Sequence, residues 1–466
     1  GVITLESDNG SDWKHVVADW GSDDEKVLMN REGENLYSLS FHIKSYYGIE
    51  ENETVLELAF VFRNVDGSQS ARSADGSDIF VPLSTPSDDY ESHQVSGNQL
   101  IVDGTSYKYV FTPWNDNLIR LSVHKEEIMS DSSYAITSGQ ENISPQVEEH
   151  EDRLIFSVGE QKVVIYKSPL SIEWRDGSQN LLKHTSSLVN AEAAGGMFTF
   201  EVDEQEHFYG TGSRAIPVDR RGYSLEFYNQ AHYGYSNGAQ NLNIAIPLVV
   251  SSKNYGLYFD NHQRSSMNMA TTGNKVRYSA DNGVLEYFFI FGNSQKSILQ
   301  NYTALTGRQE LPPIWSLGYI QSRYGYQNQD EAESVVAQMQ AGNFPMDVLV
   351  LDLYWFGSTN DMGDLNWDYD RFPQPVEMME DFENDGIKTV LITEPYFTLE
   401  SDHYDYLAQN DLLATDEAGE PFVLQGFWAG DAGLLDMTKE EARNWMWQYY
   451  KDRIEEGVAG WWTDLA

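Results

Sequence analysis

The sequence predicts a multidomain chain in which β-sandwiches precede the first half of a parallel (β/α)8 TIM barrel. Up to about residue 300, short apolar strands are separated by turns rich in Gly, Asp, Asn and Ser, a pattern typical of antiparallel sheets. After Leu311-Pro-Pro313, apolar strands alternate with helical segments, which predicts parallel βα units. Four such strands can be counted, whereas a closed parallel barrel needs eight. An open doubly wound sheet is the alternative, but no Gly-rich phosphate loop follows the first strand.

The composition restricts the partners that we expect. Asp and Glu outnumber Lys and Arg by 73 to 30, giving a formal net charge of −43, which repels nucleic acid and anionic membranes but permits a neutral carbohydrate. The absence of Cys excludes disulfides and thiol catalysis. No stretch approaches the ~20 apolar residues of a membrane span. The chain begins without a charged and apolar leader, so we expect a secreted, periplasmic or cell-surface bacterial protein whose signal peptide has been removed.

Residues 1–88 are expected to form a small β-sandwich. Residues 55–62 and 78–83 are apolar enough to be two of its strands, and a turn signal lies at 64–67. Residues 84–92 are polar and contain a proline, which predicts a linker.

A larger antiparallel sandwich is expected over residues 95–310, because short strands of alternating or apolar character continue there. The clearest of these strands are at residues 118–123, 154–158, 162–166, 244–250 and 255–259.

Residues 311–466 are expected to form the first four βα units of the barrel. Helical spacing of the apolar residues Ala332, Val335, Val336 and Met339 predicts a helix over 328–341. The strands of these units are predicted at residues 317–321, 347–354, 388–394 and 460–464, and two further helices at 376–384 and 439–456.

Each of the last three strands ends in a carboxylate: Asp352, Glu394 and Asp464. Catalytic groups lie at the carboxyl ends of parallel barrel strands, and carboxylates stabilise the oxocarbenium-like charge that forms in glycosidases. A single acid at such a position more often caps the next helix or meets solvent. Three in succession, each beside aromatic residues, favour a sugar site.

Two aromatic segments between the strands are further candidates for sugar subsites. The loop over residues 355–370 is dense in Gly, Asp and Asn and contains Trp367, and residues 427–431 supply another tryptophan. A plain surface loop would have the same composition, so both interpretations stay open for these segments.

Two motifs surround the first predicted barrel strand: Pro312-Pro-Ile-Trp-Ser-Leu-Gly318 leads into it, and Gln321-Ser-Arg-Tyr-Gly-Tyr326 follows. Here the segment resembles glycoside hydrolase family 31, whose first barrel strand begins in a similar way. Asp352, in Leu-Asp-Leu-Tyr-Trp, matches the substrate-binding acid of the second strand. Trp462-Thr-Asp464 matches the Trp-x-Asp motif that ends the fourth strand.

This resemblance implies roles for individual residues. It implies that Asp464 is the catalytic nucleophile and that Asp352 binds hydroxyls of the −1 sugar. Glu394 falls near the pocket and is expected to bind substrate. The resemblance places four more residues in the lining of the −1 subsite: Tyr324, Ile392, Trp428 and Trp462.

Two N-terminal segments also carry a resemblance. Phe208-Tyr-Gly-Thr-Gly-Ser-Arg214 is similar to a motif of the family's N-terminal sandwich. Residues 58–67 and 76–80 are similar to small Ig-like modules attached to bacterial amylases, which implies a starch-binding role for residues 1–88. Trp13, Tyr46 and Tyr47 are candidate sugar-stacking residues there, although core packing is the commoner role for each.

The resemblance implies a retaining α-glucosidase that acts on α-linked gluco-oligosaccharides. A 4-α-glucosyltransferase has the same nucleophile and differs in its acceptor, so it stays the alternative, and a non-catalytic glycan-binding protein is the alternative from another class. The family's general acid/base lies on a later segment, so we expect it beyond Ala466 in a longer polypeptide. No cofactor or metal is expected, since the mechanism requires none and no loop has EF-hand spacing.

Overall fold

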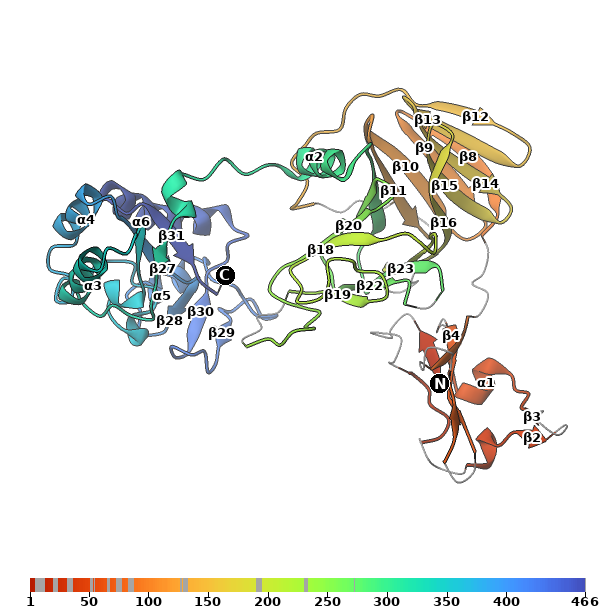
Figure 1. Cartoon of the computed structure of the whole chain (residues 1–466), viewed down its shortest axis with the longest axis horizontal. Coiled ribbons are helices and arrows are strands. Elements are labelled where there is room, and N and C mark those ends of the chain that lie inside the picture. The colour runs from red at the N-terminus through yellow and green to blue at the C-terminus, as the bar shows by residue number, and fades with distance from the viewer. Residues whose placement is uncertain are drawn as a thin grey trace. The chain divides into compact units, whose positions relative to one another are not determined.

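The chain divides into two compact units in its computed structural model, Gly1–Arg308 and Gln309–Ala466 (Figure 1). The structure describes residues 1–4, 13–19, 24–31, 37–50, 53, 55–64, 68–72, 78–82, 88–125, 128, 133–189, 195–229, 234–271 and 273–465. Residues 65–67 of the predicted turn and residues 84–87 of the predicted linker at 84–92 therefore lie outside the described residues.

The first module of the N-terminal unit is a small antiparallel sheet with one helix against it. Its three-stranded sheet has the order β1 (Val2–Thr4), β4 (Val55–Phe60) and β7 (Ile79–Pro82). The remaining elements are the short helices η1 (Glu25–Val27) and α1 (Ile43–Tyr47) and the two-stranded pairs β2 (Asn30–Arg31) with β3 (Tyr37–Ser38) and β5 (Phe62–Arg63) with β6 (Ser70–Ala71). Its assignment as an Ig-like, starch-binding module stays a prediction.

The three candidate sugar-stacking residues of this module differ in exposure. Tyr47 is buried in the small core with Val2, so it is a packing residue. Tyr46 stacks on Phe41 with 4.1 Å between ring centroids and donates its hydroxyl to a backbone carbonyl, so its ring face is covered. Trp13 is half-buried. Core packing thus accounts for both tyrosines.

Two large antiparallel sheets follow, and they pack face to face around one core. The first sheet has the order β18 (Phe208–Gly212), β20 (Ala245–Ser251), β21 (Tyr255–Tyr258), β24 (Leu285–Phe291), β11 (Leu118–His124), β10 (Lys108–Asn115), β9 (Gln99–Gly104) and β8 (Tyr90–Ser96). The second has the order β12 (Gln146–Glu149), β13 (Arg153–Val158), β14 (Gln161–Lys167), β15 (Leu170–Asp176), β16 (Gln179–Val189), β17 (Gly196–Glu201), β23 (Lys275–Ala280), β22 (Ser265–Met269) and β19 (Ser224–Phe227).

Aromatic side chains from both sheets fill the space between them. Trp174 on β15 stacks on Phe289 on β24, with 4.5 Å between centroids and 3° between planes. The Trp174 indole donates to the hydroxyl of Tyr287, which also contacts His184 Nδ1 at 3.1 Å. The buried polar atoms of Trp174, Tyr287 and His184 are therefore paired with one another inside this apolar core. The outer face of the first sheet is covered by α2 (Gln295–Thr306), whose buried Ile298 packs beside Phe288.

The predicted Phe208–Arg214 motif has a structural explanation within this unit. Gly210 and Gly212 have positive φ, and a Cβ on Gly212 would come 2.3 Å from the Ile244 carbonyl oxygen, so β18 approaches its neighbour too closely for a side chain. Arg214 is buried and donates to the backbone carbonyls of Thr211, Gln240 and Glu226. The motif therefore fixes the start of the long connection between β18 and β20.

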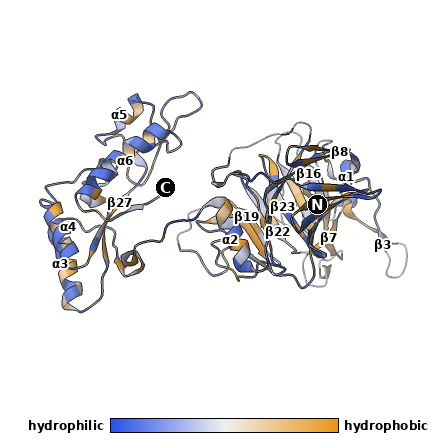
Figure 2. Ribbon diagram, turned by 90° about the horizontal axis from the view of Figure 1, so that it is seen from above, coloured by the Kyte–Doolittle hydropathy of each residue, from blue (hydrophilic) through white to orange (hydrophobic). Residues whose placement is uncertain are grey.

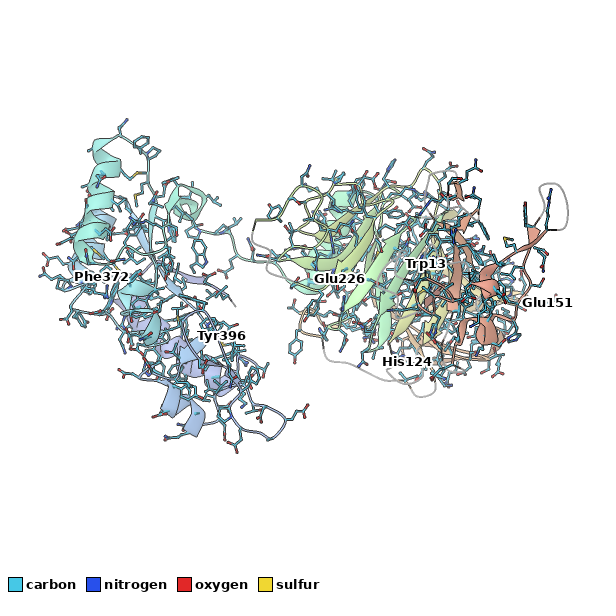
Figure 3. All side chains as sticks on the ribbon, turned by 90° about the horizontal axis from the view of Figure 1, so that it is seen from below. Trp13, His124, Glu151, Glu226, Phe372 and Tyr396 are labelled. Carbon is cyan, nitrogen blue, oxygen red and sulfur yellow. The ribbon has the colours of Figure 1, made fainter. Side chains whose placement is uncertain are left out.

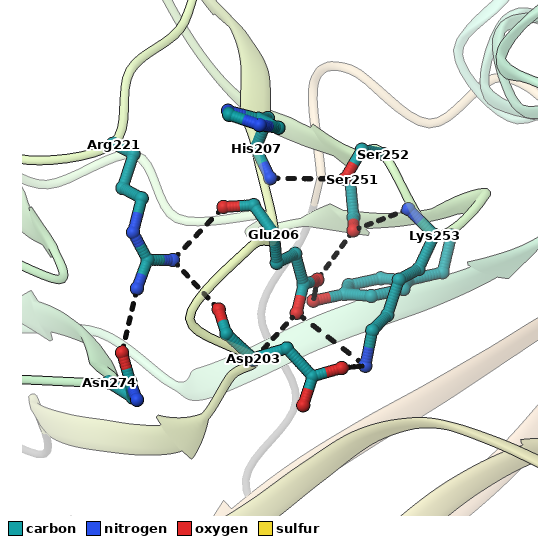
Figure 4. Close-up of polar contacts among 9 residues, drawn as sticks. Asp203, Glu206, His207, Arg221, Ser251, Ser252, Lys253 and Asn274 are labelled. Atoms are coloured by element: carbon teal, nitrogen blue, oxygen red, sulfur yellow. Dashed lines mark hydrogen bonds and ion pairs between the residues drawn. The ribbon is translucent and has the colours of Figure 1, made fainter.

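A buried carboxylate secures the turn that enters β18 (Figure 4). Glu206 accepts hydrogen bonds from Ser251 Oγ at 2.5 Å and from the Tyr255 hydroxyl at 2.6 Å. Lys253 lies 3.9 Å from the same carboxylate and also pairs with Asp203. The negative charge of Glu206 is therefore compensated, which a charge buried to this extent requires.

The C-terminal unit contains parallel βα units. Its sheet has the order β25 (Ile320–Gln321), β26 (Val348–Leu351), β27 (Lys388–Thr393) and β31 (Gly460–Thr463), and all three neighbouring pairs are parallel. The helices are η2 (Ile314–Leu317), α3 (Gln329–Ala341), η3 (Leu353–Trp355), η4 (Thr359–Asp361), α4 (Pro375–Asn384) and α6 (Glu440–Glu455). Closure into an eight-stranded barrel stays a prediction.

The helices α3 and α4 carry both hydrophobic and hydrophilic residues, as helices that cover one face of a sheet do (Figure 2). Their buried residues Val336 and Met378 share a core with Leu349 and Leu391 of the sheet. The opposite face of the sheet has a separate small cluster formed by Val348, Val350 and Ile392.

Two predicted strands are shorter than expected. The strand predicted at 317–321 covers only Ile320–Gln321, because residues 314–317 form η2. The strand predicted at 347–354 ends at Leu351, because the Asp352 side chain accepts a hydrogen bond from the Leu353 amide and starts η3.

Between β27 and α6 lies a small sheet that the sequence interpretation missed. It has the order β28 (Tyr396–Thr398), β30 (Ala432–Leu434) and β29 (Val423–Leu424), and α5 (Tyr404–Gln409) lies within the same segment. Tyr396, labelled in Figure 3, stacks on Phe427 with 4.5 Å between centroids. This contact holds the connection before β30 close to the end of β27.

Candidate active site

The three carboxylates predicted from the sequence lie on one face of the parallel sheet. Leu351 pairs with Leu391 and Thr393 with Thr463, so Asp352, Glu394 and Asp464 directly follow three adjacent strands. Side chains alternate along a strand. Asp352 and Glu394 therefore share the face of Val350 and Ile392, which pack in the small cluster on the side opposite the helices.

Backbone hydrogen bonds hold two of these acids at the ends of their strands. The Asp464 amide donates to the Thr393 carbonyl at 2.8 Å, which continues the pairing of β31 with β27 by one residue. The Asp464 carboxylate accepts from the Leu465 amide at 3.1 Å, and that of Asp352 from the Leu353 amide at 2.7 Å. The helix-capping role considered for such acids is therefore present at Asp352, alongside its place in the site.

The acids are close enough to influence one another electrostatically. Burial raises the pKa of Glu394 to about 7, with the negative charges of Asp464 and Asp352 adding to the effect and the Trp428 indole opposing it. Burial is also the main cause that raises the pKa of Asp352, and Asp464 adds to it. Like charges that converge in a partly desolvated site are typical of functional carboxylates.

Exposed aromatic residues surround the acids. Trp428 is 46% exposed and its Nε1 donates to Glu394 Oε2 at 3.4 Å. Tyr324, which is 61% exposed, meets Trp428 edge to face with 6.5 Å between centroids. Burial, the neighbouring Tyr354 and the negative charges of Asp352 and Glu394 together raise the pKa of Tyr324. Tyr324 thus faces the same acids from the loop after β25.

The remaining predicted lining residues differ in exposure. Trp462 is 44% exposed, and Ile392, its neighbour in register on β27, is 5% exposed. Ile392 accepts a hydrogen bond from the buried indole of Trp355 through its backbone carbonyl at 2.9 Å. Ile392 is therefore a buried residue two positions before Glu394, whereas the ring of Trp462 is partly exposed to solvent.

Trp367 does not line a sugar subsite. Its side chain is buried, and its Nε1 donates to Glu456 Oε2 at 2.8 Å. Trp367 also meets Trp355 edge to face at 5.3 Å. The loop at 355–370 therefore folds back over the sheet with its tryptophan inward, which the composition of the loop left open.

Arg371 was missed as a member of this neighbourhood, and Tyr354 was noted only as an aromatic residue beside Asp352. Tyr354 meets Tyr324 edge to face at 6.1 Å, and the Arg371 guanidinium lies 5.4 Å from the Tyr354 ring centroid. The position of Tyr354, two residues after the acid of the second strand, was the available signal. No signal in the sequence marked Arg371, because its contact depends on the return of the loop.

Chemically, this arrangement suits a neutral polyhydroxylated ligand. Carboxylates accept hydrogen bonds from hydroxyls, and their converging negative charge stabilises a positive charge that develops on the ligand. Exposed aromatic rings offer apolar faces for a sugar ring. Among the described residues, no group of three or more His, Asp or Glu side chains is placed to hold a metal ion.

Two models of protein families match separate parts of the chain. Residues 309–466 match the model of the glycosyl hydrolases family 31 TIM-barrel domain, and residues 108–268 match that of the glycosyl hydrolase 31 N-terminal galactose mutarotase-like domain. Together the two matches cover more than half of the chain. The chain therefore belongs to glycoside hydrolase family 31, a family of enzymes.

Relatives with assigned names are similar to the chain over much of its length. Alpha-glucosidase 2 of Bacillus thermoamyloliquefaciens is 26% identical over 80% of this chain and 50% of that protein. An isomaltosyltransferase of Sporosarcina globispora is 25% identical over 64% of this chain and 31% of that protein. The structure of a dextranase from Flavobacterium johnsoniae, complexed with glucose, superposes with a TM-score of 0.75 at 23% identity, covering 82% of this chain and 48% of that one.

The chain spans half or less of the length of these relatives. Within the part of the chain that the structure describes, no helix is both long and apolar enough to cross a membrane.

Proposed function

We propose that the chain carries the nucleophile and the sugar-binding residues of a retaining α-glucosidase that hydrolyses α-linked gluco-oligosaccharides derived from starch. The observation that supports this most is the placement of Asp352, Glu394 and Asp464 after three adjacent parallel strands on one face, with mutual electrostatic influence.

In this proposal Asp464 attacks the anomeric carbon of the glucosyl unit. A bond forms between a carboxylate oxygen and that carbon while the glycosidic bond breaks, and the leaving oxygen takes a proton from a general acid. Water then attacks the same carbon, loses a proton to the conjugate base, and frees the Asp464 carboxylate. We assign the general acid/base to no residue of this chain.

The neighbouring residues bind and enclose the sugar. Asp352 lies one strand away from Glu394 on the same face. We assign its carboxylate the role of accepting hydrogen bonds from hydroxyls of the −1 glucosyl unit. Glu394 binds a further hydroxyl. The subsite is lined by Tyr324, Ile392, Trp428 and Trp462, of which Ile392 forms the apolar floor.

A 4-α-glucosyltransferase is the second candidate. Its covalent step is the same, and a sugar hydroxyl replaces water as the attacking group. Two observations favour keeping it: one relative is named an isomaltosyltransferase, and Tyr324 and Trp428 leave aromatic surface exposed beside the acids, where an acceptor sugar would stack.

We further propose that residues 1–88 are an accessory starch-binding module and that the enzyme is secreted. The acidic composition is compatible with a neutral glucan as the ligand of this module.

The experiment that tests the function is incubation of the full-length protein with maltotriose. Release of glucose and maltose supports hydrolysis. Formation of longer oligosaccharides with little net glucose supports the transferase. Measurable binding of maltotriose without any change in the sugar would contradict both and would leave a glycan-binding protein.

A further inference from the structure

We propose that Arg371 and Gly325 are positioning residues that together hold Tyr354 against Tyr324 at the rim of the carboxylate site, and thereby set the affinity for the glucosyl unit. The inference rests on the proposed function, because it concerns the same sugar site. It assigns a role to two residues that touch neither the sugar nor the reacting atoms.

Gly325 makes the space that Tyr354 occupies. A Cβ on residue 325 would lie 2.2 Å from Tyr354 Cε2 and 2.6 Å from Cδ2, and Gly325 has φ of +76°. A ring edge held against the sheet cannot retreat as the end of a flexible side chain can. Any other residue at 325 would therefore both strain the backbone and push Tyr354 out of its place.

Arg371 holds Tyr354 from another direction. Its guanidinium carbon lies 5.4 Å from the Tyr354 ring centroid, within the range of a cation–π contact. The guanidinium pairs with Asp368 at 3.1 Å and donates to the Gln327 carbonyl at 3.3 Å. Arg371 thus links the loop after β25, through Gln327, to the loop after β26, through Asp368. The same guanidinium contacts the ring of Tyr354.

Tyr354 passes this constraint to Tyr324. The two rings meet edge to face with 6.1 Å between their centroids. Tyr324 is otherwise largely exposed and meets Trp428 on the other side. Without Tyr354 in place, its ring would be free to rotate away from Asp352 and Glu394, and part of the sugar's binding surface would be lost.

A loss of this kind changes binding more than chemistry, since the nucleophile Asp464 lies on another strand. It should therefore raise KM and leave kcat nearly unchanged. A merely structural role of Arg371 in the loop would instead lower the melting temperature and the amount of active enzyme, which lowers kcat at constant KM.

The loop that carries Gly325 also offers a matched control for Arg371. Arg323 also lies over a tyrosine ring, that of Tyr326 at 6.0 Å, and also pairs with an acid, Glu331 at 3.3 Å. Tyr326 is buried and its hydroxyl accepts from Gln321. Arg323→Met therefore removes the same kinds of contact without loosening the exposed Tyr324.

The test measures KM and kcat of the full-length protein with 4-nitrophenyl α-D-glucopyranoside for the wild type, Arg371→Met, Arg371→Lys, Gly325→Ala and Arg323→Met. We expect Arg371→Met and Gly325→Ala each to raise KM at least fivefold with kcat within twofold. Arg371→Lys, which keeps a cation near the ring, should recover part of the loss. Arg323→Met should stay within twofold of wild type.

A double variant and a conservative variant complete the test. The two substitutions act through one ring, so Arg371→Met combined with Gly325→Ala should raise KM no more than the worse single variant, whereas independent effects would multiply. Tyr354→Phe keeps the ring that meets Tyr324 and lies against Gly325, so it should raise KM by a smaller factor than Arg371→Met and still fold.

The same variants are compared for the affinity of 1-deoxynojirimycin by titration calorimetry, which does not depend on turnover. Unchanged KM and affinity in Arg371→Met, or multiplicative effects in the double variant, would overturn the inference and leave the proposed function standing. A wild-type protein that neither turns over the glucoside nor binds the inhibitor would overturn both.

Discussion

The indole Nε1 of Trp428 donates a hydrogen bond of 3.4 Å to Oε2 of Glu394. This contact joins two parts of the C-terminal unit that are separated in sequence: the end of the third parallel strand and the small sheet inserted after it. The donor opposes the upward shift of the Glu394 pKa that burial and the neighbouring acids produce. Trp428 therefore affects both the shape of the site and the charge of Glu394.

The raised pKa of Glu394 predicts a specific dependence of stability on pH. In the folded protein this pKa is about 7, against an ordinary value of 4.5, so the folded state keeps a proton that the unfolded state has already lost. The contribution of Glu394 to the free energy of unfolding therefore falls as pH rises from about 4.5 to about 7, and is constant above that. Glu394→Gln cannot lose a proton and removes this contribution.

The measurement is the difference in melting temperature between Glu394→Gln and the wild type at pH 5 and at pH 8. The variant should gain stability relative to the wild type at pH 8. An equal difference at the two pH values would show that Glu394 titrates in its ordinary range.

Trp428→Phe separates the hydrogen bond from the aromatic surface. The phenyl ring keeps an apolar face and loses the donor, so the pKa of Glu394 should rise further and the pH dependence above should extend to higher pH. Trp428→Ala also loses the ring, and we expect kcat/KM to fall about tenfold, the equivalent of roughly 1.4 kcal/mol. Melting temperatures across pH 5–9 check the first expectation, and steady-state kinetics check the second. Identical pH profiles of the melting temperature for the wild type and Trp428→Phe would contradict the role given to the indole.

Asp352→Asn should weaken substrate binding. Hydrogen bonds to charged groups contribute about 1.5–3 kcal/mol, so kcat/KM should fall about tenfold to a hundredfold. Asp364→Asn is a matched control: burial raises the pKa of Asp364 as well, but its carboxylate accepts from the Asp402 amide in the segment after β28. The control should lower stability and leave kcat/KM within about threefold. Equal losses in the two variants would remove Asp352 from the sugar site.

The N-terminal unit gives a prediction about stability alone. Tyr255→Phe deletes the 2.6 Å hydrogen bond to the buried Glu206 carboxylate (Figure 4), and an unsatisfied buried group costs about 1–3 kcal/mol. Urea unfolding should show this loss. Tyr258→Phe, which deletes a 3.2 Å contact with the half-buried Asp260, should cost less. The reverse order would contradict the account of this network.

Much of the fold was predictable because it follows from local patterns. Apolar patterns located five strands of the two large sheets, β11, β13, β14, β20 and β21, and the spacing of Ala332 and Val336 located α3 close to its observed bounds. The ends of strands were less predictable, since they depend on single hydrogen bonds such as that of Asp352 with the Leu353 amide. The small sheet of β28, β30 and β29 was missed because its strands have only two or three residues each.

The site was predictable as far as it depends on strand ends. The acids after three consecutive strands were identified from the sequence, and the structure brings them to one face. The direction of a loop tryptophan was not predictable: Trp367 and Trp428 lie in similar loops, and only one is exposed. The contact of Arg371 with Tyr354 was also beyond the sequence, because it requires the loop to return across the strand end.

The identity of the nucleophile is the central claim, and trapping the covalent intermediate tests it most directly. The full-length protein is treated with 5-fluoro-α-D-glucosyl fluoride, digested, and analysed by mass spectrometry, with Asp464→Asn treated in parallel. We predict a glucosyl adduct on the peptide that ends β31, located on Asp464, and no adduct in the variant. An adduct on Glu394 or Asp352, or labelling that persists in Asp464→Asn, would contradict the account.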